Sequence, residues 1–167
     1  MSRCLVGSEM CIRDRNKGVH LKENNEVVSF CENGSLTTRG SETLNYDFIV
    51  NAAGPWAKEL LKTNNIQSNF NMSLVRGSHL ILDFKIQSPL VLQSTKDKRI
   101  VFMLPLDNGC LLGTTEYSHN IKDPIVCTQI ERDYLVDIAN TYLEKTLTQK
   151  NIISDYAGVR PLVFDSN

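Results

Sequence analysis

Short apolar runs separated by turn signals recur along the second half of the chain, and they predict a protein rich in strands. The runs read SLVRGSHLILDF, PLVLQS, RIVFMLPL and GCLLGTTE, with Pro89, TKDK and DNG between them. Because little helical pattern separates these runs, they are typical of a largely antiparallel sheet rather than of repeated strand–helix–strand units. A final run, IISDYAGVRPLV, is expected to return to this sheet as a further strand.

One segment between these runs has a helical period. In QIERDYLVDIANTYLEKTL, apolar residues recur every three or four positions, which places them on one face of a helix. The residues expected on this face are Ile130, Tyr134, Leu135, Ile138, Tyr142 and Leu143.

The first half of the chain has a different pattern. Strand-like runs with turns at KENN and ENGS predict a β-meander, and Asn33-Gly34 is a strong hairpin signal. The run YDFIV, residues 46–50, is apolar and β-branched, as in a buried parallel strand. The following PWAKELLKTNN predicts a helix with Pro55 in its first turn and Gly54 at or near its N-cap.

We therefore predict two partial domains, an α/β domain of nucleotide-binding type over residues 16–71 and an antiparallel sheet with a helix over residues 72–167. Residues 1–15, MSRCLVGSEMCIRDR, show no helical or strand period and resemble translated sequencing-adapter DNA. They are expected to be non-native. The chain also stops abruptly after GVRPLVFDSN, so we expect it to be an internal piece of a longer protein.

Composition and charge narrow the function classes. A hydrophobic fraction of 41% and a charged fraction of 22% are ordinary for a soluble globular domain, and a net charge of −1 gives no basis for binding nucleic acid. Five scattered cysteines without a C-x-x-C pair fit neither a disulfide framework nor a metal site. They favour a reducing, cytoplasmic compartment. Cys31 and Cys110, inside strand-like runs, are expected to be small buried hydrophobes.

The turn NAAGPW, residues 51–56, is the first candidate binding feature. Small residues between a strand and a helix let a ligand approach the backbone closely, and the N-terminus of the helix favours an anion such as a phosphate. A tight strand-to-helix turn with no ligand explains the same residues. The motif therefore indicates a ligand without identifying one.

Two polar residues lie inside otherwise apolar strands. In RGSHL, Gly77 and His79 share one face of a strand, and the glycine is expected to leave open space above the imidazole. On sequence alone, a hydrogen-bonded structural histidine is the favoured alternative to a ligand site. In GVRPL, Arg160 needs an anionic partner, either a substrate phosphate or carboxylate or an internal Asp or Glu. The hydroxyls of GTTE are expected to bond their own turn, and the lysines and Arg99 of KDKR to form a solvated turn.

Four of these segments together carry a family resemblance. FIVNAAGPWAKELL, VRGSHLIL, KDKRIVFMLPLDNGCLLGTTE and YAGVRPL occur in an order and spacing similar to those of the FAD-dependent, quinone-reducing glycerol-3-phosphate dehydrogenases. The resemblance implies part of a Rossmann-like FAD-binding domain of glutathione-reductase type, followed by a substrate domain. It also implies oxidation of glycerol 3-phosphate to dihydroxyacetone phosphate, with quinone as acceptor, a peripheral contact with the cytoplasmic membrane and a homodimer in the whole protein.

The resemblance also implies roles for individual residues. Ala52, Ala53 and Gly54 would be small because FAD passes there, and the backbone of Val27 would lie near the adenine. His79 would lie near the hydroxyl carbon that loses hydride, and Arg160 would hold the phosphate.

The chain departs from the family pattern in two respects: the dinucleotide fingerprint G-x-G-x-x-G is absent from it, and the C-terminal part that completes the flavin site in the family is expected to be missing. For these reasons the 167-residue chain is expected to be inactive alone. Two alternatives stay open: an amine or hydroxy-acid oxidase of the same fold, with Arg160 against a carboxylate, and a non-catalytic binding module that keeps the scaffold.

Overall fold

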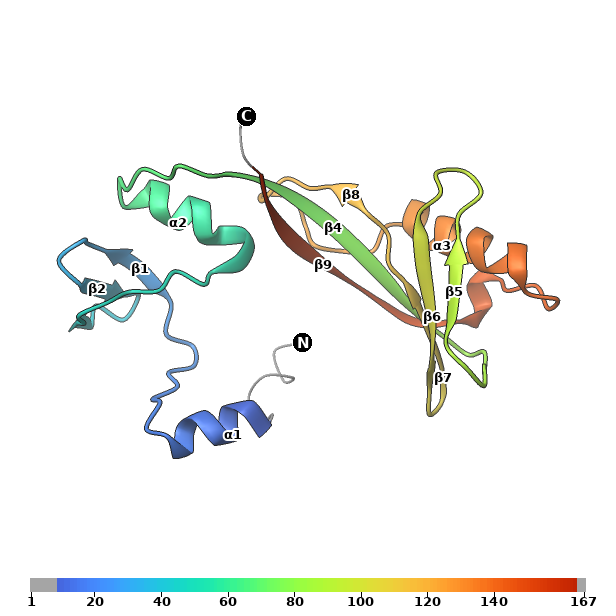
Figure 1. Cartoon of the computed structure of the whole chain (residues 1–167), viewed down its shortest axis with the longest axis horizontal. Coiled ribbons are helices and arrows are strands. Elements are labelled where there is room, and N and C mark those ends of the chain that lie inside the picture. Colours follow the sequence, from blue (N-terminus) through green and yellow to red (C-terminus); the bar gives the residue numbers. More distant parts are fainter. Residues whose placement is uncertain (1–8, 165–167) are drawn as a thin grey trace. The chain divides into compact units, whose positions relative to one another are not determined.

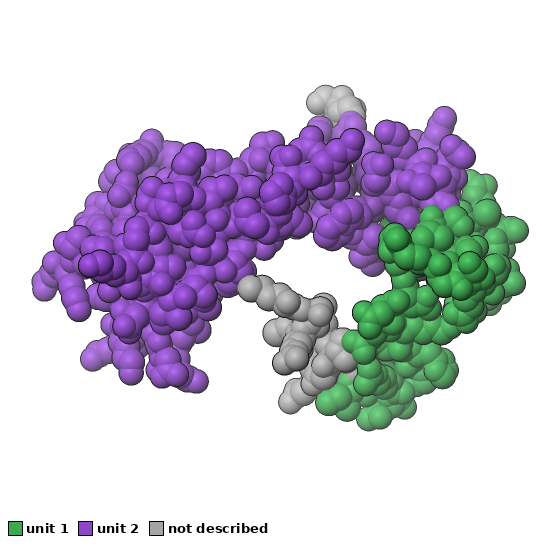
Figure 2. Space-filling model, turned by 180° about the vertical axis from the view of Figure 1, so that it is seen from behind, with its two compact units in different colours: residues 1–51 green, residues 52–167 purple. Residues whose placement is uncertain are grey.

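The computed structural model of the chain describes residues 9–164. The chain forms two compact units, residues 1–51 and residues 52–167, shown in green and purple in Figure 2. The predicted domain boundary between residues 71 and 72 concerns the whole protein and stays a prediction.

The first unit contains a three-stranded antiparallel meander, as predicted, with the strand order β1-β2-β3. Gly34 turns the β1–β2 hairpin with a positive φ of 85°, and its N–H donates to the carbonyl oxygen of Cys31 at 3.1 Å. Any side chain at Gly34 would collide with the backbone of Tyr46, which explains the Asn-Gly signal. The elements are α1 (Glu9–Asn16), β1 (Val27–Phe30), β2 (Ser35–Thr38) and β3 (Thr43–Asn45).

Three expectations for this unit were wrong. Helix α1 forms in a segment where no helical period was found, and Cys31 is exposed. Residues 46–50 form no strand, and Phe48 and Val50 are 89% and 86% exposed. A buried parallel strand needs neighbouring strands, and every strand pair within residues 9–164 is antiparallel.

The second unit begins with the predicted helix. A 3₁₀ turn, η2 (Gly54–Trp56), precedes α2 (Ala57–Thr63), and Pro55 lies in the first turn as expected. Ala53, rather than Gly54, is the N-cap of η2, and Gly54 lies inside the turn with a φ of +55°. The Trp56 N–H donates to the Ala53 carbonyl at 3.1 Å.

A six-stranded antiparallel sheet forms most of this unit, as the apolar runs predicted. Its long central strand β4 pairs with β9 along one edge and with β7 and β8 along the other, and β6 and β5 extend the sheet beyond β7 (Figure 1). The strands are β4 (Asn71–Leu82), β5 (Leu90–Gln93), β6 (Ile100–Leu106), β7 (Gly109–Gly113), β8 (Tyr117–Ser118) and β9 (Ile152–Phe164).

Helix α3 (Gln129–Tyr142) covers one face of the sheet, and a short 3₁₀ turn, η3 (Gln149–Asn151), leads from it into β9. The helix buries Leu135 and Ile138 as predicted, but Ile130 and Tyr142 are exposed and Glu131 is fully buried. Alternate residues of β4, β6 and β7 complete this core: Leu80, Leu82, Val101, Met103, Cys110 and Leu112. Within residues 9–164, no helix is long and apolar enough to cross a membrane.

Candidate functional site

Among residues 52–164, no α-helix covers the face of the sheet opposite α3, and this face carries the candidate site (Figure 1). The register of the strands places five residues in one row across this open face: Val91, Phe102, Gly113, His79 and Tyr156. Val91 and Phe102 are exposed, at 66% and 47%. Apolar side chains and an imidazole are therefore presented together on a surface that residues 52–164 leave uncovered.

His79 is held between its two neighbours in this row. Its ring stacks on Tyr156, with centroids 4.9 Å apart and an interplanar angle of 11°. On the other side lies Gly113, where a Cβ atom would come within 2.8 Å of the His79 Cγ and 3.0 Å of its Nε2. Gly113, and not Gly77 as expected, therefore makes room for the imidazole.

The imidazole of His79 is kept neutral by its surroundings. Burial and the positive charge of Arg160 lower the pKa of His79 below its ordinary 6.5. The buried Nδ1 has no hydrogen-bond partner among the described residues. A neutral imidazole has one nitrogen that can accept a proton, and the ring of His79 borders an adjoining hollow. This hollow of about 170 Å³ is lined by His79, Phe102, Leu104, Leu111, Gly113 and Thr114.

Arg160 lies on the same open face, one strand away from His79. Its guanidinium extends over Gly77, where any Cβ would collide with Nη2, and Nη2 donates to the Thr114 hydroxyl at 3.2 Å. The open space expected above Gly77 is thus occupied by Arg160. The side chain is 45% exposed and borders a hollow of about 230 Å³.

Glu116 and Arg99 join Arg160 at this hollow, and the sequence did not reveal this arrangement. The Glu116 carboxylate forms an ion pair with Arg99 and lies 3.6 Å from the Arg160 guanidinium. Arg99 was expected in a solvated turn, and the ion pair with Glu116 was not foreseen. The hydroxyl of Thr114 bonds its own turn as expected, donating to the Thr115 carbonyl oxygen at 3.2 Å. Strand alternation could not have revealed the placement of Arg99, because Arg99 alternates in step with Val101 and Met103, which are buried on the other face of the sheet.

Between His79 and Arg160, the sheet has a pair of glycines. Gly77 of β4 lies directly opposite Gly158 of β9, and a Cβ at Gly158 would meet no atom within 4 Å. Over Gly158 the open face is therefore bare of side chains, while the Arg160 guanidinium lies over Gly77. Such a floor can seat a small molecule with a hydroxyl at one end and an anionic group at the other.

The family model described as "FAD dependent oxidoreductase" matches residues 12–167, nearly the whole chain. The chain belongs to the FAD-dependent oxidoreductase family. The predicted cofactor, FAD, is thereby confirmed at the level of the family.

Relatives of this FAD-dependent oxidoreductase carry the name that the resemblance implied. An aerobic glycerol-3-phosphate dehydrogenase of Staphylococcus haemolyticus is 28% identical over 94% of this chain and 31% of its own length. One of Staphylococcus aureus is 32% identical over 86% of this chain and 27% of its own length. The chain thus spans less than a third of the length of these relatives.

A solved structure confirms the predicted fold class. The glycerol-3-phosphate dehydrogenase from Bacillus halodurans complexed with FAD superimposes with a TM-score of 0.86 at 24% identity, over 95% of this chain and 35% of that one. At this identity, the likeness concerns the fold alone.

Two features of this oxidoreductase fit a flat, partly apolar cofactor. The open face offers exposed apolar side chains in the same row as the ring of His79. The predicted cofactor turn, Ala52, Ala53 and Gly54, leads into η2, which contacts β9, and a Cβ at Gly54 would meet no atom within 4 Å. Val27 begins β1 in the first unit, and its predicted role at the adenine stays a prediction.

Proposed function

We propose that this chain is part of a flavoprotein that oxidises sn-glycerol 3-phosphate to dihydroxyacetone phosphate. The observation that carries the proposal is the placement of His79 and Arg160 on one open sheet face, on either side of the Gly77–Gly158 pair. The curated relatives are named aerobic glycerol-3-phosphate dehydrogenases, and these names support the assignment of glycerol 3-phosphate as the substrate. Because the chain covers less than a third of their length, the activity belongs to the whole protein.

Arg160 binds the substrate phosphate in this proposal. A guanidinium has five N–H donors in a planar fork that matches phosphate oxygens. Thr114 accepts one of these hydrogen bonds, and the exposed part of the side chain faces the hollow beside it. The phosphate is thereby held at one end of the glycine floor, with the carbon chain directed along it.

His79 accepts the proton of the substrate hydroxyl. A base at this position must be neutral, and the surroundings of His79 lower its pKa for that purpose. The stack on Tyr156 fixes the plane of the ring, so the accepting nitrogen keeps one direction. When bound, FAD supplies the redox chemistry by taking up the hydride from the substrate carbon.

The setting of the whole protein is also part of the proposal. Quinone is the proposed electron acceptor, and the protein is proposed to be a cytoplasmic homodimer attached peripherally to the cytoplasmic membrane. The similarity to aerobic glycerol-3-phosphate dehydrogenases supports this setting.

Steady-state kinetics of the full-length protein test the substrate assignment. With glycerol 3-phosphate and glycerol as the two substrates, the wild type should strongly prefer the phosphorylated one. Arg160→Lys keeps the charge and loses the fork, so kcat/KM should fall roughly ten- to a hundredfold, as expected for one lost charge-assisted hydrogen bond of about 1.5–3 kcal/mol. Arg160→Ala should lose most of the preference and keep the flavin spectrum.

The controls separate this function from the alternatives. The 167-residue chain expressed alone should show neither flavin absorbance nor turnover. A preference that survives Arg160→Ala would make Arg160 a structural partner of Glu116. Oxidation of small amino acids or hydroxy acids in place of glycerol 3-phosphate would identify an oxidase instead, and a flavin-free full-length protein would identify a binding module.

A further inference from the structure

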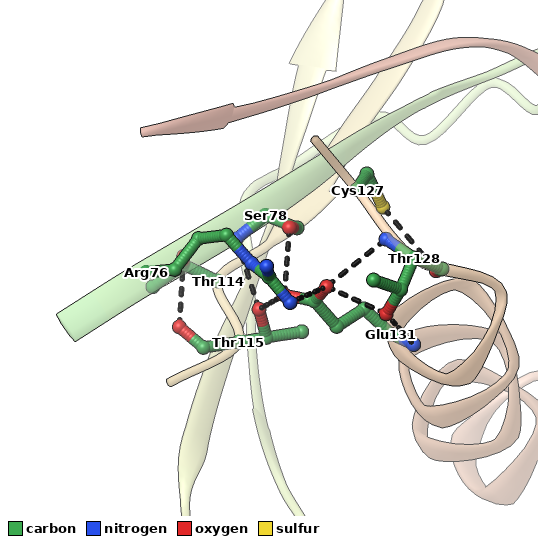
Figure 3. Close-up of polar contacts among 7 residues, drawn as sticks. All are labelled: Arg76, Ser78, Thr114, Thr115, Cys127, Thr128 and Glu131. Carbon is green, nitrogen blue, oxygen red and sulfur yellow. Dashed lines mark hydrogen bonds and ion pairs between the residues drawn. The ribbon is translucent and has the colours of Figure 1, made fainter. Parts of the chain in front are cut away.

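A fully buried carboxylate lies on the opposite side of the sheet from the candidate site. Glu131, at the start of α3, has an exposed fraction of 0%. Figure 3 shows its two oxygens surrounded by donors from three separate segments. Although burial alone would raise it, the hydrogen bonds from Thr128, Ser78 and Thr115 lower the pKa of Glu131 to about 2. The side chain is therefore a carboxylate throughout the physiological range.

The donors come from the N-cap of α3, from β4 and from the segment after β7. At the N-cap, Thr128 donates its hydroxyl at 2.7 Å and its N–H at 3.0 Å to Oε2, which closes a capping box. From β4, Arg76 donates to Oε2 at 2.8 Å and Ser78 to Oε1 at 2.8 Å. The Thr115 hydroxyl donates to Oε1 at 2.9 Å and accepts from the Ser78 N–H at 2.9 Å.

The residues that Glu131 binds alternate with residues that border Arg160. On β4, Arg76 and Ser78 flank Gly77, the residue beneath the guanidinium of Arg160. After β7, Thr115 lies between Thr114 and Glu116, which are the hydrogen-bond and ion-pair partners of Arg160.

The buried carboxylate of Glu131 thus binds, from the α3 side of the sheet, both backbone segments that border the Arg160 guanidinium. A cap alone would need only Thr128. The three further donors from two other segments are beyond what the helix requires.

We propose that Glu131 is a positioning residue for the anion site, acting through Thr115 and β4 to hold Arg160 in place. This inference rests on the proposed function, since it takes Arg160 as the group that binds the substrate phosphate. Glu131 itself lies on the covered face of the sheet and touches no substrate. Its loss should loosen binding of the phosphorylated substrate and leave the chemical step at His79 nearly unchanged.

The decisive variant is Thr115→Val in the full-length protein. Valine keeps the shape of threonine and removes the hydroxyl that joins Glu131 to the Ser78 N–H. The KM for glycerol 3-phosphate should rise roughly two- to thirtyfold, the range seen for residues that act on a site through others. The kcat and the kinetics with glycerol should stay near those of the wild type. Thr115→Ser, which restores the hydroxyl, should restore KM.

Asn140→Ala is the matched control for stability. Asn140 lies near the other end of α3, where its side chain exchanges hydrogen bonds of 3.0 and 2.7 Å with the backbone of Leu147. This variant should lower the Tm without changing KM. Glu131→Gln is a second variant, and it should raise KM in the same direction as Thr115→Val.

The outcomes separate this inference from the proposed function. If Arg160→Ala loses the preference for the phosphorylated substrate while Thr115→Val keeps a wild-type KM, the positioning role is overturned and the function stands. A KM that rises equally in Asn140→Ala would also overturn it, because the effect would then follow stability alone. If Arg160→Ala keeps the preference, the proposed function fails and this inference fails with it.

Discussion

Replacing Gly77 with alanine should displace Arg160 while leaving the sheet folded. The added Cβ would lie 2.5 Å from the Thr114 hydroxyl and 3.0 Å from the Thr115 carbonyl oxygen, and it would collide with the Arg160 guanidinium. The guanidinium is the far end of a flexible side chain that is 45% exposed. It can therefore move outward, and the free energy of unfolding should fall by only about 1 kcal/mol, the lower end for overpacking.

The functional cost of this displacement should be larger than its cost in stability. Arg160 would lose its hydrogen bond to Thr114, 3.2 Å long, and its alignment with a phosphate on the glycine floor. A lost charge-assisted hydrogen bond of about 1.5–3 kcal/mol corresponds to a fall in kcat/KM of roughly ten- to a hundredfold. The fall should lie mainly in KM, because His79 is not moved.

Two other glycines of the same face provide matched comparisons. Gly158→Ala places a methyl group where no atom lies within 4 Å, so stability and the position of Arg160 should stay as in the wild type, while the methyl group on the glycine floor should raise KM for both substrates alike. Gly113→Ala instead places its Cβ within 3.0 Å of the His79 ring. The imidazole must leave its stack on Tyr156, and kcat should fall by about a hundredfold, as for a displaced catalytic group.

The assay is reduction of an artificial electron acceptor by the flavin-loaded full-length protein, with glycerol 3-phosphate and with glycerol. Gly77→Ala should raise KM mainly for the phosphorylated substrate, Gly113→Ala should lower kcat, and Gly158→Ala should raise KM for both substrates alike. Equal effects of Gly77→Ala and Gly158→Ala would refute the reasoning, since only one of these methyl groups meets Arg160. Melting temperatures measured in parallel separate unfolding from loss of function.

Three further predictions follow from single groups. Gly54→Val should abolish flavin absorbance in the purified full-length protein, because a β-branched residue rarely adopts the φ of +55° found at this position. A fully flavin-loaded, active variant would contradict this prediction. Burial and Arg160 lower the pKa of His79 below its ordinary value of 6.5, so protonation should inactivate this base only at a pH below 6.5. A fall in kcat/KM that already begins above pH 6.5 would count against His79 as the base. The pKa of Glu131 falls from 4.5 to about 2 on folding, which corresponds to about 3 kcal/mol of stability. This contribution is complete above pH 4.5 and is lost as pH falls toward 2, so acid titrations of unfolding should show a smaller loss in Glu131→Gln.

The strands of the second unit were predictable because their signals are local. Apolar runs bounded by turn residues marked β4, β5, β6, β7 and β9, and the structure confirms each of them. The Asn33-Gly34 turn likewise predicted its hairpin, since a positive φ at Gly34 is a property of the turn itself. For residues 46–50 the same reasoning was wrong, because an apolar run becomes a parallel strand only beside neighbouring strands.

The site was only partly predictable, because its geometry depends on register. His79 and Arg160 stood out as polar residues in apolar strands, and the structure places both on the open face. The identity of the glycine beside each side chain could not be read from the chain, since Gly113 reaches His79 only through the pairing of β4 with β7. The buried face of α3 was misplaced for a related reason, because Glu131 turns inward to donors on other elements.

The two interpretations of Arg160, an ion pair or a phosphate ligand, are compatible in this structure. Glu116 pairs with both Arg99 and Arg160, and its distance of 3.6 Å from Arg160 exceeds a hydrogen bond. Among the described residues, the guanidinium donates one hydrogen bond, to Thr114, out of its five N–H donors. The carboxylate therefore balances the charge of Arg160 without using its fork. An arginine held in this way stays extended on the sheet and keeps its remaining donors for an incoming phosphate.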